Sequence, residues 1–267
     1  MTERRLRARV AYDGSAFAGW QRQPGARTVQ GVIEAALTEI MGQDVRVVGA
    51  GRTDAGVHAS GQIMHFDSRW IGHPVDVRRA ANAVLPRDVA LLRVSSAPPG
   101  FHARYSATAR SYRYRLWCRQ VRQPLVRRTS LHVPFPLDVE AMARAADRLI
   151  GSHDFAALGR PVGGSEITVR RLDRLDVVKR GAFVDLCFVG NAFLRHQVRR
   201  TVGLLLDIGR GKWPPETVDA VLAGHAGAPT AWRAPAWGLT LTSVSYPSET
   251  EFIARAEMRA LTGGEER

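Results

Sequence analysis

Hydrophobic and polar residues alternate along the chain with two different periods. A period near two is typical of strands that bury one face, and a period near 3.6 is typical of helices that bury one side. In the first part of the chain these periods predict strands over 5–12, 44–50, 62–66 and 89–94, and helices over 28–41 and 76–85. Thr28 and Gly42 are suitable residues to begin and end the first helix. The predicted order is therefore β-α-β-β-α-β.

The same order returns in the second part of the chain. The pattern there predicts strands over 110–117, 172–179, 182–189 and 239–246, and helices over 138–150, 193–208 and 216–222. Two β-α-β-β-α-β units are typical of ferredoxin-like, RRM-like halves. We therefore expect an α+β fold in which both halves share one mainly antiparallel sheet of eight strands, with helices on one side and a central cleft.

Length and composition agree with two such halves. The chain has 267 residues, of which 45% are hydrophobic, and this is enough to bury a sizeable core. We expect an N-terminal half over 1–107, a C-terminal half over 108–247 and an acidic tail over 248–267.

The formal net charge of +13 favours a polyanionic partner, and nucleic acid is the simplest one. The charge is unevenly spread, because residues 89–137 contain no acid. This stretch holds nine arginines, at positions 93, 104, 110, 113, 115, 119, 122, 127 and 128. A solvated basic face is the alternative explanation, but a one-sided stretch of this length favours contact with phosphates.

Several function classes are disfavoured by what the sequence lacks. No stretch approaches the ~18 apolar residues of a membrane-spanning helix. Cys118 and Cys187 are the only cysteines and form no C-x-x-C pair, and the histidines show no metal-ligand spacing. The polar N-terminus has no apolar core of a secretion signal. We expect a cytoplasmic protein without a membrane segment or a metal.

The candidate chemistry lies in a glycine-rich loop over 49–56, between two predicted strands. The spacing suggests a dinucleotide fingerprint, but Asp54 stands where the third glycine belongs and no helix follows. An aspartate in a turn is most often only a turn residue. Here, however, Arg52 lies two residues before it, and the loop has more glycines than a turn requires. Asp54 is therefore the candidate reactive group.

Six short blocks of the sequence form a set of motifs that is informative when taken together. They lie at 12–21, 51–59, 101–114, 151–155, 190–199 and 234–239, and the second block reads Gly51-Arg52-Thr53-Asp54-Ala55-Gly56-Val57-His58. In sequence and order these blocks resemble the TruA-type tRNA pseudouridine synthases. The resemblance implies the pseudouridine synthase fold and an isomerase that converts uridine to pseudouridine at positions 38, 39 and 40 of the tRNA anticodon stem-loop. It also implies a homodimer that needs no cofactor.

The resemblance assigns roles to individual residues. Asp54 matches the catalytic aspartate and Arg199 the arginine that pairs with it, while Tyr112 matches the tyrosine that packs on the target uracil. Arg52 matches the arginine that takes the place of the flipped base. The tRNA-binding residues that it implies are Phe101, His102, Ala103, Arg104, Tyr105, Arg110 and Arg113. The chain departs from the family pattern at Gln197 and Leu158, neither of which has a chemical role.

The physical chemistry of the reaction agrees with these residues. One carboxylate can act as the nucleophile, at C6 of the base or C1′ of the ribose, and a neighbouring guanidinium keeps it charged. Helical periodicity places both Arg195 and Arg199 at the edge of a buried face and does not choose between them. The main alternative is a non-catalytic RNA-binding protein with two RRM-like units, although the aromatic RNP1 pattern of such units is missing.

Overall fold

A computed structural model describes residues 3–161 and 166–252, so most of the expected acidic tail, 253–267, lies outside the described residues. Contacts divide the chain into two compact units. The first holds the residues up to Thr53, then Ala59–Thr108, and those from Ser243 onward. The second holds Asp54–His58 and Ala109–Thr242. The short segment that begins with Asp54 therefore packs with the second unit, although it lies in the N-terminal part of the sequence.

The first unit is a small sheet covered by two helices. Its elements are β1 (Arg4–Tyr12), the 3-10 turn η1 (Gly14–Ala16), α1 (Val29–Met41), β2 (Val48–Gly49), β3 (His58–Ser68), α2 (Pro74–Val84) and β4 (Val89–Ser96). Strand β1 pairs antiparallel with both β3 and β4, and β2 pairs antiparallel with β3. The order β4-β1-β3-β2 is that of a ferredoxin-like unit.

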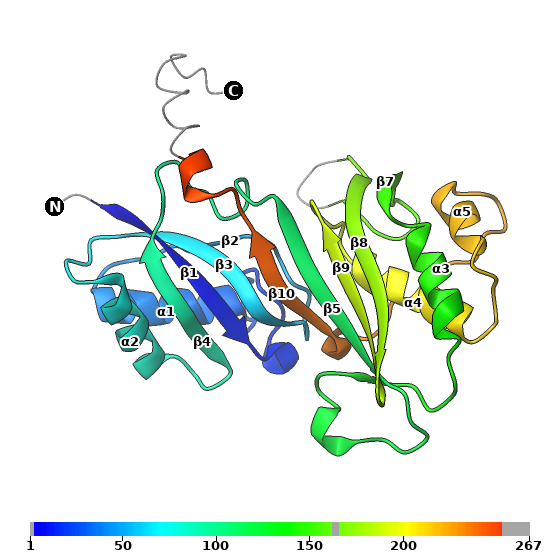
Figure 1. The fold of residues 1–267 in the computed structure, drawn as a ribbon. Coiled ribbons are helices and arrows are strands. Elements are labelled where there is room, and N and C mark those ends of the chain that lie inside the picture. The colour runs from blue at the N-terminus through cyan, green and yellow to red at the C-terminus, as the bar shows by residue number, and fades with distance from the viewer. Residues whose placement is uncertain (1–2, 162–165, 253–267) are drawn as a thin grey trace, which may run out of the picture. The chain divides into compact units, whose positions relative to one another are not determined.

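Alternation along β1 separates the two faces of this sheet. Leu6, Ala8 and Val10 are buried, as a strand with one apolar face requires, whereas Arg5 and Arg9 are exposed on the other face. In Figure 1, α1 lies behind β1 and β4. Helix α2 packs against β4 and α1.

Both predicted ends of α1 are confirmed, but the strand predicted next to it is mostly wrong. Thr28 Oγ1 accepts a hydrogen bond from the amide of Gly31, and Gly42 ends the helix in the left-handed conformation at φ 64°. Of the strand predicted over 44–50, only β2 forms. The amides of Val45 and Val47 donate instead to side chains of α1, at Thr38 Oγ1 and Glu34 Oε1.

The second unit repeats the plan with additions. Its elements are β5 (Ala109–Trp117), η2 (Pro124–Val126), β6 (Leu131–His132), α3 (Val139–Asp147), β7 (Gly151–Asp154), β8 (Val169–Arg180), β9 (Phe183–Gly190), α4 (Gln197–Gly209), α5 (Thr217–Leu222), η3 (Ala236–Gly238) and β10 (Leu239–Ser245), whose last three residues belong to the first unit. Strand β9 pairs antiparallel with β5 and β8, β8 pairs antiparallel with β7, and β6 runs parallel to β5.

The expected α+β class is confirmed, with more strands than predicted. The strands form a ten-stranded sheet in the order β4-β1-β3-β10-β5-β9-β8-β7, with β2 on β3 and β6 on β5. Strands β6 and β7 are not among the eight predicted, because they are only two and four residues long and show no apolar alternation. Helix α4 begins at Gln197, four residues later than predicted, since Arg195 first forms a β-bridge with Arg160.

The core of the second unit lies between its strands and the helices α3 and α4. Tyr114 and Leu116 of β5 point into it, as do Val202 and Leu205 of α4. The α4 side chains at 198, 202, 205 and 206 are buried, as their helical spacing predicts, and Leu194 just before the helix is buried too. This core supports the segment that carries Asp54, because Val57 is buried in the same cluster.

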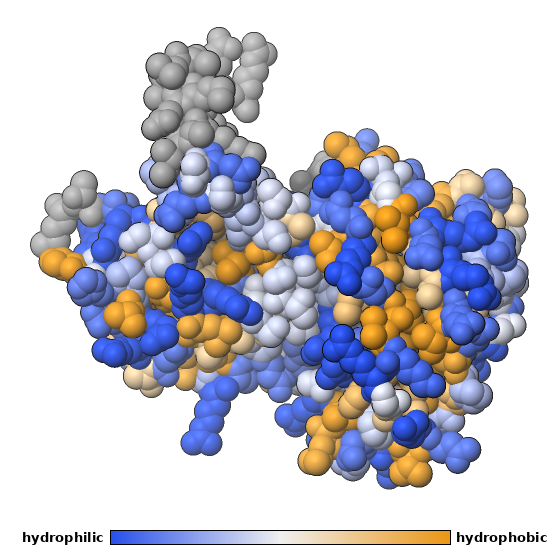
Figure 2. All heavy atoms as spheres, in the orientation of Figure 1, coloured by the Kyte–Doolittle hydropathy of each residue, from blue (hydrophilic) through white to orange (hydrophobic). Residues whose placement is uncertain are grey.

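The loop between β5 and β6 carries part of the acid-free stretch. It contains Arg119, Arg122, Arg127 and Arg128, and its apolar residues Val121 and Leu125 are 77% and 92% exposed. Apolar spheres are visible at the tip of this loop, at the bottom of Figure 2. The basic stretch is thus not one uniform polar surface.

His65 of β3 makes the stability of the protein depend on pH. Its Nδ1 accepts a hydrogen bond from the amide of Ala103, and burial lowers the pKa of His65 from 6.5 to about 4. The unfolded chain therefore binds more protons between those pH values, and the free energy of unfolding falls as the pH drops through that window, by up to about 3 kcal/mol. We expect urea unfolding to show a smaller fall in His65→Asn, whose side-chain oxygen can still accept from Ala103. Parallel curves for the two proteins would contradict this expectation.

Candidate active site

The segment before Asp54 is anchored in the first unit. Gly49 lies against the ring of Trp20, and a Cβ at that position would come within 2.6 Å of the indole. The amide of Trp20 donates to the carbonyl oxygen of Thr53 over 3.1 Å, and the Tyr12 hydroxyl lies 2.8 Å from Thr53 Oγ1. The close approach explains the first glycine of the loop, and these bonds fix the residue that precedes Asp54.

The segment after Asp54 is anchored in the second unit. The amide of Val57 donates to the carbonyl oxygen of Asp54, and His58 Nε2 lies 2.6 Å from the carbonyl oxygen of Arg128. Gly56 has a φ of 78°, and a Cβ there would lie 3.1 Å from that of Ala236. Asp54 is therefore held on both sides of a tight turn, with 25% of its side chain exposed.

Asp54 is paired with Arg199 of α4. Arg199 Nη1 donates to Asp54 Oδ2 over 3.1 Å, and its side chain is only 10% exposed. Its Nε donates to the carbonyl oxygen of Ala234 over 2.7 Å, which fixes the guanidinium from the other side. Burial lowers the pKa of Arg199 and Asp54 opposes this, but the ordinary value is so high that the group stays charged. Arg195, the other candidate from periodicity, is exposed.

Tyr112 lies close enough to Asp54 to feel its charge. Burial raises the pKa of Tyr112 to about 12, Arg110 opposes the shift, and Asp54 adds to it. The phenol therefore stays protonated at neutral pH. Its ring meets Phe193 edge-on, with 5.2 Å between the ring centroids. Tyr112 thus offers a neutral aromatic ring beside the carboxylate.

Two further residues, which the sequence did not single out as site residues, belong to this cluster: His196 lies near the carboxylate, and Arg233 contacts His196. His196 Nε2 is 3.6 Å from Asp54 Oδ2, and Arg233 Nη1 is 3.1 Å from the same nitrogen of His196. In the sequence, His196 lies within the block at 190–199, and Arg233 directly precedes the block at 234–239. Nothing else in the sequence pointed to a site role for either residue.

A family model described as tRNA pseudouridine synthase matches residues 8–106 and 145–247, which is most of the chain. The chain belongs to the tRNA pseudouridine synthase family. As a member it is an isomerase that converts uridine to pseudouridine in tRNA. This membership does not favour the alternative of a non-catalytic RNA-binding protein.

Curated relatives match this synthase over nearly their whole length. The protein named tRNA pseudouridine synthase A in Frankia casuarinae is 47% identical over 95% of this chain and 93% of its own. Proteins of the same name are 42% identical in Syntrophotalea carbinolica, over 90% and 96%, and 44% identical in Moorella thermoacetica, over 90% and 99%. The matched family segments contain Asp54 and Arg199, whereas Tyr112 lies in the unmatched stretch between them.

Not every residue expected to bind tRNA is accessible in this synthase. Phe101 and Ala103 are fully buried in a cluster with Ala50 and Phe252, so their side chains are core residues of the first unit. We therefore leave both out of the contact surface.

Their neighbours form an exposed aromatic group. Tyr105 is 77% exposed and stacks on His102, with 4.4 Å between ring centroids, and the Arg104 guanidinium lies over the Tyr105 ring. The Nδ1 of His102 accepts from the amides of Arg104 and Tyr105, which orders the turn. The turn thus presents an exposed aromatic ring beside an exposed arginine.

The remaining predicted residues of the synthase are spread over different surfaces. Arg52 is exposed. Arg110 donates to the carbonyl oxygen of Asn191 over 2.6 Å. Arg113 lies on the face of β5 opposite to Tyr112, because side chains alternate along a strand. Arg115 is not free for phosphates: it forms two hydrogen bonds, of 2.7 and 2.8 Å, to the carboxylate of Asp185.

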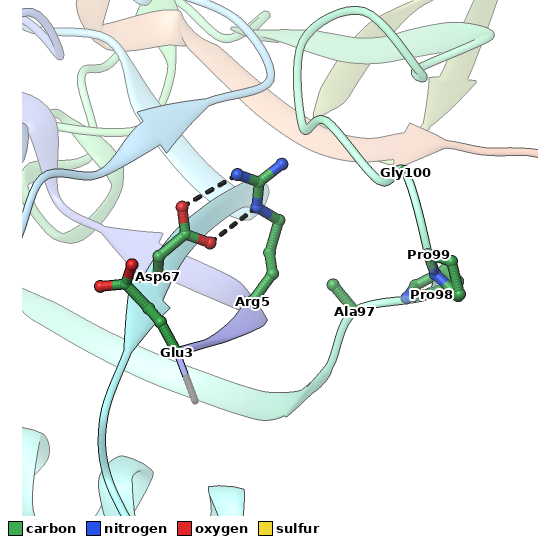
Figure 3. A pocket seen from close by; sticks show the side chains of 7 residues that line it. All are labelled: Glu3, Arg5, Asp67, Ala97, Pro98, Pro99 and Gly100. Atoms are coloured by element: carbon green, nitrogen blue, oxygen red, sulfur yellow. Dashed lines mark hydrogen bonds and ion pairs between the residues drawn. The ribbon is translucent and has the colours of Figure 1, made fainter. Parts of the chain in front are cut away.

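A pocket of the first unit, shown in Figure 3, lies among Glu3, Arg5, Asp67 and the segment 97–100. Arg5 donates to both carboxylate oxygens of Asp67 and to the carbonyl oxygen of Phe101. Since the two charges compensate each other, the pocket lacks the free cation that a phosphate would need.

Within residues 3–161 and 166–252, no three His, Cys, Asp or Glu side chains are grouped so that they could hold a metal ion. No helix in that part of the chain is both long and apolar enough to span a membrane.

Proposed function

We propose that this synthase converts uridine to pseudouridine at positions 38, 39 and 40 of the tRNA anticodon stem-loop, with Asp54 as the nucleophile. The observation that carries the proposal is the ion pair of Asp54 with the nearly buried Arg199. An aspartate whose only role was to stabilise a turn would need no such cation. The pair holds a charged carboxylate in place beside an aromatic ring.

The reaction is an isomerisation in which atoms and electrons balance within the substrate. The N1–C1′ bond breaks, the uracil turns while it stays bound, and a C5–C1′ bond forms. The proton on C5 leaves and N1 takes one up, so nothing is oxidised and no cofactor is needed.

The two carboxylate oxygens of Asp54 have different roles in this reaction. Oδ2 is held by Arg199, whereas Oδ1 has no hydrogen-bond partner among the described residues. Oδ1 is therefore the oxygen that attacks, at C6 of the uracil or at C1′ of the ribose.

The target base must leave its stack before the carboxylate can reach it, and unstacking costs a few kcal/mol. Arg52, exposed two residues before Asp54, is placed to fill the gap that the base leaves. Tyr112 is placed to pack on the flipped uracil, and stacking on an aromatic ring contributes ~1–3 kcal/mol per base.

The proposed tRNA contacts are those cations and rings that the fold leaves accessible. They are His102, Arg104, Tyr105, Arg110, Arg113 and the arginines of the loop between β5 and β6. From the family resemblance we propose a cytoplasmic homodimer that needs neither metal nor cofactor.

An anticodon arm that carries 5-fluorouracil at the target position tests the role of Asp54. Fluorine at C5 blocks the loss of the C5 proton, so the intermediate should accumulate. Mass spectrometry of the digested protein should then show the modified nucleotide on the peptide that contains Asp54, and the linked atom distinguishes attack at C6 from attack at C1′. The same arm with uracil serves as the control. Tight binding without adduct or pseudouridine would favour the RNA-binding alternative.

A further inference from the structure

His196 has an unusual backbone. It is the only residue other than glycine with a positive φ in the described part of the chain, at 68°. Side chains with a Cβ avoid this region unless the surroundings impose it. His196 sits at the start of α4, yet its side chain does not cap the helix. The conformation instead directs the imidazole to Asp54 and Arg233.

The contact with Arg233 determines the state of the imidazole. A guanidinium can only donate, so His196 Nε2, 3.1 Å from Arg233 Nη1, accepts the hydrogen bond. The ring is then neutral, with its proton on Nδ1. Burial lowers the pKa of His196, and Arg233, Arg195 and Arg199 act in the same direction, while Asp54 opposes them. All these neighbours together therefore leave His196 uncharged at neutral pH.

Arg233 consequently keeps an uncompensated positive charge beside the nucleophile. Its partner is a neutral ring, and it forms no ion pair with any acid of the described residues. The charge of Asp54 is already matched by Arg199. Arg233 is also exposed, and its segment carries two partly exposed indoles, Trp232 and Trp237, which are 41% and 44% exposed. An exposed guanidinium that no acid compensates is suited to a phosphate of a nucleic-acid backbone.

We propose that Arg233 binds a phosphate of the RNA next to the target nucleotide, and that His196 is the positioning residue that holds its guanidinium there. This inference rests on the proposed function, because it places the RNA backbone at Asp54. Arg199 holds the nucleophile in place, and Arg233 locates the substrate by its phosphate.

The test is binding of an unmodified anticodon arm as a function of salt concentration, together with kcat and KM. A lost phosphate contact weakens binding and lowers the log–log salt slope by about one. For Arg233→Gln we expect Kd and KM to rise about tenfold, the slope to fall by about one, and kcat to change less than about twofold. Arg233→Lys should keep the salt slope of binding but lose part of the affinity, because lysine retains the positive charge without the planar set of N–H donors of the guanidinium.

Three more variants make the test specific. His196→Asn tolerates the left-handed backbone and removes the imidazole, so it should weaken binding in the same direction. Because His196 acts through Arg233, the double variant should bind no worse than Arg233→Gln alone. Arg148→Gln is the matched control: it removes the same charge from an arginine that Asp219 and Glu216 already pair, and should leave the slope unchanged.

Three results would overturn the inference. One is a salt slope in Arg233→Gln equal to that of the unaltered protein. Another is an equal effect of Arg148→Gln. The third is a fall of kcat with unchanged binding, which would place Arg233 in the chemistry. Failure of the proposed function is a separate outcome, since a protein that makes no pseudouridine would still report the phosphate contact through its binding.

Discussion

We expect Asp54→Asn to lower the rate of pseudouridine formation by about 10⁴-fold or more, while RNA binding and the fold stay intact. The amide keeps the shape of the carboxylate but removes the charge and the nucleophilic oxygen. Loss of a nucleophile typically removes most of an enzyme's rate enhancement. Because 25% of the side chain is exposed and its environment is polar, we expect the neutral amide to be tolerated.

Release of tritium from RNA labelled at uracil C5 measures this effect directly, since the C5 proton leaves in the reaction. Single-turnover conditions separate the chemical step from product release. Asp44→Asn is the matched control, because Asp44 is 87% exposed and has no role in the site. If Asp54→Asn released tritium at the normal rate, Asp54 could not be the nucleophile.

We expect Arg199→Gln to lower kcat by about 10²–10³-fold, the usual effect of removing one electrostatic contact at a reacting group. We also expect the free energy of unfolding to fall by roughly 1–3 kcal/mol, since the bond to the carbonyl oxygen of Ala234 is lost and Asp54 is left without its cation. Arg199→Lys should recover part of the rate, because it restores the charge but not both bonds.

Two measurements distinguish these effects. Tritium release at saturating RNA reports kcat, and the urea midpoint reports stability. Arg200→Gln is the control, since it removes the same charge from α4 at a position that does not contact Asp54. An Arg199→Gln protein with full activity would show that the ion pair serves only the fold. An equal loss of rate in Arg200→Gln would show that the general charge of α4 matters rather than the pair.

Elements whose stability depends on nearby residues were predictable from the sequence. The alternation of β1 and the ends of α1 at Thr28 and Gly42 are examples. So are the two strands predicted over 172–179 and 182–189, which pair as β8 and β9 on either side of Gly181, whose φ is 61°. Strand pairing and helix capping use groups only a few residues apart, and their pattern is therefore visible along the chain.

Segments that bond to distant groups were not predictable in this way. The strand expected over 44–50 alternates correctly, but the side chains of Glu34 and Thr38 take its amides before a neighbouring strand can. The late start of α4 depends on the bridge between Arg195 and Arg160, which are 35 residues apart. No pattern in the neighbouring sequence indicates a partner so distant along the chain.

The sequence by itself determined the plan of two β-α-β-β-α-β halves and, through the Gly51 to His58 motif, the candidate reactive carboxylate. Periodicity left Arg195 and Arg199 equally placed on a helix margin, and only the family resemblance pointed to Arg199. The tertiary structure shows Arg199 paired with Asp54, and it alone decided that His196 lies near Asp54, that Arg233 contacts His196, and that Phe101 and Ala103 are buried. The reason is physical: periodicity follows from backbone geometry within one element, whereas contacts between charges 145 residues apart depend on how the core packs.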